Sequence, residues 1–444
     1  MNRRLISLGV LAMLIPGAMV SQSLTLQECI RIGLERNLAL KNVQIEVAKG
    51  ETGIKESRSR LLPTVHAAFQ LADYLKEPVN TTTGALIDSD FPDNPTWQKV
   101  HSMPWQASAM LTAQLPLWNE TIRAATEAAK IVKELKVLGY EKAREQLTMQ
   151  IAKVYYLVQG GKEQIRLLDE DLLRMKELKN ITKALLEQGV VLDTDYRRIG
   201  INIASLEAQR GQMKMVYEQQ LNTLRFLLDY DSDKPIEVVP IRPRIESTSF
   251  NGLFSALPDE RLAETRLTLI DRQRRMVRKG YLPSLALFGQ AGYLGNQEKF
   301  KEFFRSHESH WFGTVALGVK LSIPIFDANQ KRLKLRQYRY EEEQASLALQ
   351  QVRRQNERDY GNALLQLAQN EKVFTTQTEA CEQARDVYAI TEVRYREGVA
   401  SMTELLQDDM RLITAEQQVA VALTQWHLAH LEWLRLENKL SDLK

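Results

Sequence analysis

A repeated order of strand, proline and very long helix constrains the fold of this chain more than any other feature. In Trp311–Phe326, apolar residues alternate with small or polar residues, which is the period-two pattern of a β-strand. The alternation stops at Pro324, and the chain continues in a helical pattern. The same order occurs earlier, where an alternating segment at 105–115 is followed by Pro116 and a second helical run. We therefore expect two copies of one structural unit.

The spacing of landmark residues supports this duplication. Pro116 and Gly189 are 73 residues apart, Pro324 and Gly398 are 74 apart, and each glycine is followed by a valine. Agreement to one residue over this length indicates two matched helical hairpins. The predicted organisation is a first copy at 24–228 with strands at about 64–74 and 105–115, a proline-containing linker at 229–258, and a second copy at 259–444 with strands at about 284–294 and 311–323.

The predicted helices are too long for an ordinary globular domain. Runs of almost 70 residues reach roughly 100 Å at 1.5 Å per residue. Their apolar stripes are narrow and rich in alanine, so these helices must pack side by side as in coiled coils. A shorter helical pattern covers 24–62, and Gly160-Gly161 is expected to break or kink the long helix of the first copy. The fold class is therefore mainly α, with two strands in each repeat.

The four strands determine how many chains must cooperate. Each has about ten residues and alternating faces, which suits a membrane barrel strand of 9–11 residues. An open sheet cannot lie in lipid, because its edges would leave backbone groups unpaired. Bacterial barrels begin at eight strands, so two or three chains must share one barrel. We expect the side with Val315 and Leu317 to face lipid and Lys320 to face the lumen.

The first 23 residues are predicted to be a secretory signal peptide. A short basic region at Asn2-Arg3-Arg4 is followed by an apolar run at 5–15 and by helix-breaking Pro16. Cleavage is expected between Ala18 and Leu24. No later segment approaches the roughly 20 apolar residues that a membrane helix needs. The net charge of +3 is nearly balanced, which gives no indication of a nucleic-acid partner.

The chain resembles the TolC-type outer-membrane efflux channels over essentially all of its mature sequence. Its start, Leu24-Thr25-Leu26-Gln27-Glu28-Cys29-Ile30 followed by Asn37, is similar to the start of that family, as are the prolines after the strands and the paired glycine–valine turns. The resemblance implies a homotrimer with a twelve-stranded barrel in outer-membrane lipid, continued by an α-helical barrel in the periplasm. It also implies a periplasmic adaptor and an inner-membrane transporter of the RND, ABC or MFS type as partners.

The same resemblance implies an exit duct for tripartite efflux or type I secretion, gated at its periplasmic tip, with no catalysis and no cofactor. Family members carry acidic residues six and nine positions after the second glycine, which are Glu404 and Gln407 here; Asp408 follows directly. In the first copy the sixth position is Asp195. A ring of carboxylates would attract cations. The arginine that locks the family's closed tip is replaced by Ala400.

The turns and the strand-ending prolines complete the predicted site. Gly189 and Gly398 are each expected to end a helix in the left-handed conformation, with Val190 and Val399 presented to the adaptor. The two strand-ending prolines are expected to mark the junction between barrel and tunnel.

Several readings stay open at this point. The acid at position 404 and Asp408 also fit a role in capping a helix or stabilising its dipole. A secreted coiled-coil adhesin or structural fibre without a pore is the alternative function, although a fibre has no need of barrel-length strands. His427 and His430 are expected to pack beside tryptophans rather than bind metal. The basic run at 272–279 fits either lipid headgroups or a solvated surface.

Overall fold

The computed structural model describes residues 23–76, 79–83, 97–101, 103–230, 236–241, 257–304, 311–440 and 443. Residues 1–22 of the predicted signal peptide at 1–23 and most of the linker between the copies lie outside these residues. The chain divides into two compact units. The strand unit comprises Gln44–Gly139 and Asp259–Val352, and the helix unit comprises Met1–Val43, Tyr140–Pro258 and Arg353–Lys444. Each unit therefore combines segments of both sequence copies.

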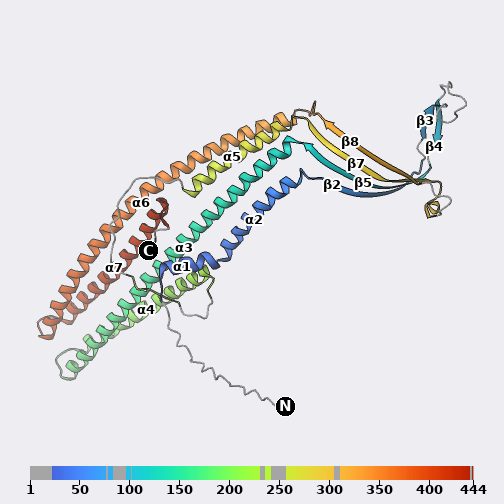
Figure 1. Ribbon diagram of the computed structural model, residues 1–444. Coiled ribbons are helices and arrows are strands. Elements are labelled where there is room, and N and C mark those ends of the chain that lie inside the picture. The colour runs from blue at the N-terminus through green and yellow to red at the C-terminus, as the bar shows by residue number, and fades with distance from the viewer. Residues whose placement is uncertain are drawn as a thin grey trace, which may run out of the picture. The chain divides into compact units, whose positions relative to one another are not determined.

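The strand unit contains a four-stranded antiparallel sheet in the order β2-β5-β7-β8 (Figure 1). The strands are β2 (Thr64–Asp73), β5 (Trp105–Trp118), β7 (Ser284–Gln297) and β8 (Trp311–Ser322). A separate hairpin pairs β3 (Val79–Thr83) with β4 (Trp97–His101). Among the described strands, none pairs with the outer edge of β2 or of β8. The sheet is therefore open at both sides within one chain.

Two of the strands run further than the alternation predicts. Strand β5 continues through Pro116 to Trp118, with an irregularity in its pairing to β7 between these two residues. Proline lacks an N–H group and is tolerated in a sheet at such a bulge. The prediction that the strand ends before this proline is therefore wrong, whereas Pro324 lies beyond the end of β8 as expected. Strand β7 extends three residues past the expected end at 294.

Segments of four helices in the strand unit meet the same end of the sheet (Figure 1). Helix α2 (Leu38–Ser59) leads into β2, and α5 (Pro258–Lys279) leads into β7. Helix α3 (Glu120–Glu187) follows β5, and α6 (Gln330–Arg396) follows β8. On β8, Val315 and Leu317 are strongly exposed. The sheet thus presents an apolar surface that one chain does not cover.

The helix unit packs two long hairpins and a short N-terminal helix. Helix α3 returns as α4 (Asp193–Leu228), and α6 returns as α7 (Met402–Leu436). Helix α1 (Leu26–Arg36) packs against α4, and β1 (Ser23–Leu24) pairs with β6 (Glu237–Val238). Two apolar cores, one near α1 and one nearer the turns, contain the fully buried residues Ile151, Leu224, Leu431, Met175, Ile199 and Leu405. In the part of the chain that is described, no helix combines the length and apolarity needed to cross a membrane.

The N-terminal helical pattern is divided at Asn37, which the sequence does not indicate. The backbone of Asn37 leaves the helical conformation (φ −52°, ψ 121°), and its Nδ2 donates to the carbonyl of Leu227 at 3.0 Å. Its Oδ1 accepts from the N–H of Leu40 at 3.1 Å, so the same side chain caps the following helix. The division between α1 and α2 thus depends on a contact with α4.

The predicted break at Gly160-Gly161 is wrong, because α3 is continuous from Glu120 to Glu187. A Cβ atom on Gly160 would lie 2.3 Å from Thr424 Oγ1 of α7. The glycine therefore allows the close approach of the two helices.

Candidate functional site

The two hairpins of the helix unit turn with the same backbone geometry. Gly189 and Gly398 have φ values of 73° and 75°. After each glycine, the backbone N–H of the valine donates to the carbonyl of the residue five positions before that valine, at 2.9 Å for Val190 and 2.8 Å for Val399. The glycine N–H donates to the carbonyl three residues earlier in both turns. These are Schellman caps, and they confirm the predicted left-handed glycines.

The turns expose apolar side chains on one side and bury them on the other. Val190 and Val399 are 67% and 66% exposed, and Leu192 is similarly exposed. Ala400 and Met402, by contrast, pack into the core near the turns. Each turn therefore carries a small apolar surface that lacks cover within its own chain.

Glu404 lies in the first turn of α7 and carries a solvent-accessible carboxylate. Its backbone N–H donates to the Oγ of the capping residue Ser401 at 3.2 Å. Its carboxylate accepts from Arg394 Nη1 at 3.3 Å, with both side chains almost half exposed. The side chain that caps α7 is therefore that of Ser401, and the Glu404 carboxylate remains near solvent.

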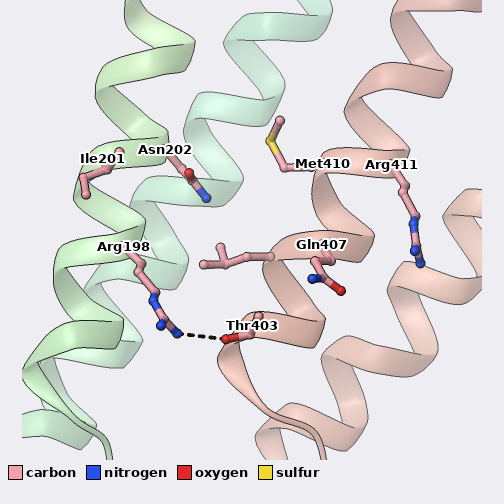
Figure 2. Close-up of a pocket in the computed structure, with 8 residues that line it drawn as sticks. Arg198, Ile201, Asn202, Thr403, Gln407, Met410 and Arg411 are labelled. Carbon is pink, nitrogen blue, oxygen red and sulfur yellow. Dashed lines mark hydrogen bonds between the residues drawn. The ribbon is translucent and has the colours of Figure 1, made fainter.

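A cavity of about 390 Å³ lies between α4 and α7, close to the turns (Figure 2). Figure 2 shows Arg198 of α4 reaching Thr403 at the start of α7, and its Nη1 donates to Thr403 Oγ1 at 2.8 Å. The same guanidinium lies 3.4 Å from Asp195 Oδ1. Gln407 lines the cavity from α7. Two of the predicted gate positions, Asp195 and Gln407, thus lie at this contact between the two hairpins. Glu404 pairs instead with Arg394 of α6.

Arg198 is a residue that the sequence analysis missed. It stands in a polar stretch of α4 that resembles any solvated helix surface, and its partner Thr403 is 205 positions away. No local pattern links the two, so only the packing of α4 on α7 identifies them.

Asp408 lies inside the bundle and does not face an opening. It is buried between α6 and α7, where its Oδ2 accepts from Thr391 Oγ1 at 2.8 Å. Its Oδ1 accepts from Arg411 Nη1 at 2.9 Å. The structure therefore places this carboxylate differently from the aperture position expected of it.

A cluster of buried charges joins α3, α6 and α7 further from the turns. Asp171 and Asp409 are 0% and 2% exposed, and Glu416 is nearly as buried. Arg174 donates to Asp171, while its guanidinium nitrogens lie 3.8 Å from both Asp409 and Glu416. Arg385 of α6 lies 2.8 Å from Glu416. We call these five residues the buried charge cluster: Asp171, Arg174, Arg385, Asp409 and Glu416.

Burial dominates the electrostatics of this cluster. It raises the pKa of Asp171 to about 7 and that of Asp409 to about 6, and Arg174 only partly opposes the effect. Glu416 adds a like charge that raises both pKa values further. The cluster therefore takes up protons in the pH range just below neutrality.

Two histidines of α7 and both cysteines are packed inside the helix unit. His427 stacks on Tyr156 at 4.4 Å between ring centroids, and His430 stacks on Trp426 at 5.0 Å. This packing confirms the interpretation favoured from sequence. Cys29 and Cys381 are buried free thiols. No group of three or more His, Cys, Asp or Glu residues within the described ranges could hold a metal ion.

Comparison with known proteins assigns these features to a family. The model of the outer membrane efflux protein family matches residues 30–229 and 258–435. The chain belongs to the outer membrane efflux protein family. The probable efflux pump outer membrane protein TtgC of Pseudomonas putida is 22% identical over 404 residues, covering 88% of this chain and 78% of TtgC.

Solved structures agree on the fold. The outer-membrane channel OprN matches with a TM-score of 0.73 at 18% identity, covering 93% of this chain and 90% of OprN. The outer membrane channel CmeC of Campylobacter jejuni matches with a TM-score of 0.72 at 17% identity, covering 93% and 85%. These likenesses confirm the predicted TolC-like, mainly helical fold. As a member of the outer membrane efflux protein family, the chain is an outer-membrane channel component of an efflux pump that works with pump partners, and it is not an enzyme.

Proposed function

We propose that three copies of this chain form one exit duct that carries substrates from the periplasm to the exterior. The open sheet is the observation that carries this proposal. Both edge strands of an outer-membrane protein cannot stay unpaired in lipid, and β8 is antiparallel to β2 through the order of the sheet. Pairing β8 of one copy with β2 of the next keeps the antiparallel pattern. Four strands from each of three copies close a barrel of the size that bacteria use.

The contact between α4 and α7 near the turns supports a gate at the helical end. Arg198 joins the two hairpins through Thr403 by one hydrogen bond between partly exposed side chains. Such a contact costs little to break, because water replaces it readily. In this proposal its loss lets the hairpins separate and opens the duct, while Asp195 and Glu404 supply carboxylates to the aperture.

The exposed valines of the turns support docking of a periplasmic adaptor. Val190 and Val399 occupy matching positions after the two left-handed glycines. Three copies would repeat this pair around the end of the duct. The partners in this proposal are a periplasmic adaptor and an inner-membrane transporter of the RND, ABC or MFS type, in a tripartite pump or a type I secretion system. The barrel–tunnel junction lies at Pro116 and Pro324.

Cysteine cross-linking tests the shared barrel. In a background carrying Cys29→Ser and Cys381→Ser, His66→Cys on β2 would be combined in turn with Thr314→Cys, Ala316→Cys or Gly318→Cys on β8. One combination should give disulfide-linked trimers in outer-membrane fractions. The control is His66→Cys with Thr112→Cys, which face each other within one chain and should link only intramolecularly. Monomers alone from every edge pair would contradict the proposal.

A further inference from the structure

Basic residues concentrate where the four helices of the strand unit meet the sheet. The segments 55–60, 119–130, 270–280 and 327–339 contain fifteen Lys and Arg residues and five Asp and Glu residues. The whole chain is nearly balanced, with 59 basic and 56 acidic residues. The excess of basic over acidic residues is therefore confined to these segments. We call these four segments the basic collar.

Internal ion pairs account for only part of this charge. Lys279 pairs with Glu120 at 3.2 Å, Arg275 with Asp271 at 2.8 Å, and Lys331 with Asp327 at 3.0 Å. Arg274 pairs with Glu342 and Asp271. Four exposed arginines of the collar make no salt bridge with any described residue: Arg58, Arg278, Arg332 and Arg336. Within a single chain, these guanidinium groups are open to an external anion.

An exposed apolar belt separates the collar from the sheet. Ile325 and Phe326, between β8 and α6, are 94% and 82% exposed, and Leu62 before β2 is also exposed. The belt continues the apolar surface of β8, where Val319 and Leu321 are exposed. From sheet to helix the surface therefore passes from apolar strand to apolar belt to basic collar. This is the order of hydrocarbon, interface and headgroup in one leaflet of a bilayer.

We propose that the basic collar binds the phosphate groups of anionic phospholipids in the leaflet nearest the helices. The proposal rests on the membrane barrel proposed above and adds a lipid preference to it. Arginine matches phosphate with two parallel hydrogen bonds, and its aliphatic part can lie along the apolar belt while the charged end reaches the headgroup. The adjoining apolar belt favours a lipid over a soluble anion or a polar glycan, neither of which would cover it.

The test uses the full-length protein reconstituted into nanodiscs of phosphatidylcholine mixed with phosphatidylglycerol. The collar variant combines Arg58→Gln, Arg278→Gln, Arg332→Gln and Arg336→Gln. Native mass spectrometry would measure how many phosphatidylglycerol molecules stay bound relative to phosphatidylcholine. One basic residue near an anionic surface corresponds to about a fivefold change in affinity. The wild type should therefore retain phosphatidylglycerol preferentially, and the collar variant should lose this preference at least about tenfold.

Two controls separate lipid binding from general effects of charge and folding. The first neutralises four exposed basic residues of the helix unit, by Lys153→Gln, Lys183→Gln, Arg354→Gln and Lys372→Gln, and should keep the preference. The second control replaces by lysine the four arginines changed in the collar variant. It should keep most of the preference for phosphatidylglycerol.

Three results would overturn the proposal, and they differ from one another. An unchanged preference in the collar variant, or none in the wild type, would contradict lipid binding while leaving the barrel intact. If soluble peptidoglycan fragments displaced the bound phosphatidylglycerol, and the collar variant lost binding of these fragments equally, the collar would be assigned to a glycan. Failure of the wild type to insert into either lipid would contradict the barrel itself.

Discussion

Charged residues are used in opposite ways at the turns and in the middle of the helix unit. Near the turns, Arg394 and Glu404 form an ion pair with both side chains almost half exposed. In the buried charge cluster, Asp171 and Asp409 are withdrawn from water and depend on Arg174. Exposed pairs contribute about 0–1 kcal/mol each, whereas an uncompensated buried charge costs several times more. The ion pair near the turns can therefore break at little cost, whereas the buried charge cluster stabilises the packing of the two hairpins.

Removing Arg174 should give the largest effect, because three buried carboxylates would lose their common counter-charge. We expect Arg174→Ala to lower the free energy of unfolding by about 3–5 kcal/mol, measured by urea unfolding of the purified protein in detergent. Arg197→Ala, at an exposed arginine that pairs with Asp193, is the matched control and should change the free energy of unfolding by less than about 1 kcal/mol. Equal effects of the two variants would show that the buried charge cluster stabilises the protein no more than an exposed ion pair does.

Acidification should stabilise the helix unit through the same cluster. Folding raises the pKa of Asp171 to about 7 and of Asp409 to about 6, against about 3.9 in an unfolded chain. The folded state thus binds more protons between about pH 4 and 7, so the unfolding free energy should rise as pH falls from 8 to 5, by roughly 2–4 kcal/mol. Asp171→Asn should flatten this dependence, while Glu170→Gln, at the exposed neighbouring residue, should not. A pH profile that Asp171→Asn leaves unchanged would refute the assignment.

Glu404 and Asp408 lie one turn apart on α7, yet one carboxylate is accessible and the other is buried. Asp408→Asn should lower the unfolding free energy by about 1–3 kcal/mol, since it disturbs the bonds to Thr391 and Arg411. Glu404→Gln should leave stability nearly unchanged and weaken block by divalent cations in planar-bilayer conductance. If Asp408→Asn alone altered the block, the aperture would have to include this buried residue.

The smallest effect on stability is expected for Arg198, whose role in the proposed gate concerns opening. Arg198→Ala should change the unfolding free energy by less than about 1 kcal/mol and increase the open-state lifetime in single-channel recordings. The neighbouring variant Arg197→Ala should leave the recordings as in the wild type. An unchanged open-state lifetime in Arg198→Ala would mean that other contacts hold the duct closed.

The local features of this protein could be predicted from its sequence, because their determinants lie within a few residues of one another. The left-handed turns at Gly189 and Gly398 need only a glycine and the carbonyls three and four residues before it. The alternation in Trp311–Ser322 likewise specifies a strand with one apolar side. The two-copy spacing and the resemblance at the N-terminus then sufficed to predict the family.

Only the tertiary structure decided which side chains meet. Gln407 and Asp408 are neighbours in sequence, but successive helix positions differ by about 100°, so one lines the cavity and the other is buried. Asn37 ends a helix because Leu227 lies beside it, and Pro116 stays in a strand because β7 accommodates a bulge. Contacts between segments hundreds of residues apart follow from helix packing, and no local sequence pattern encodes that packing.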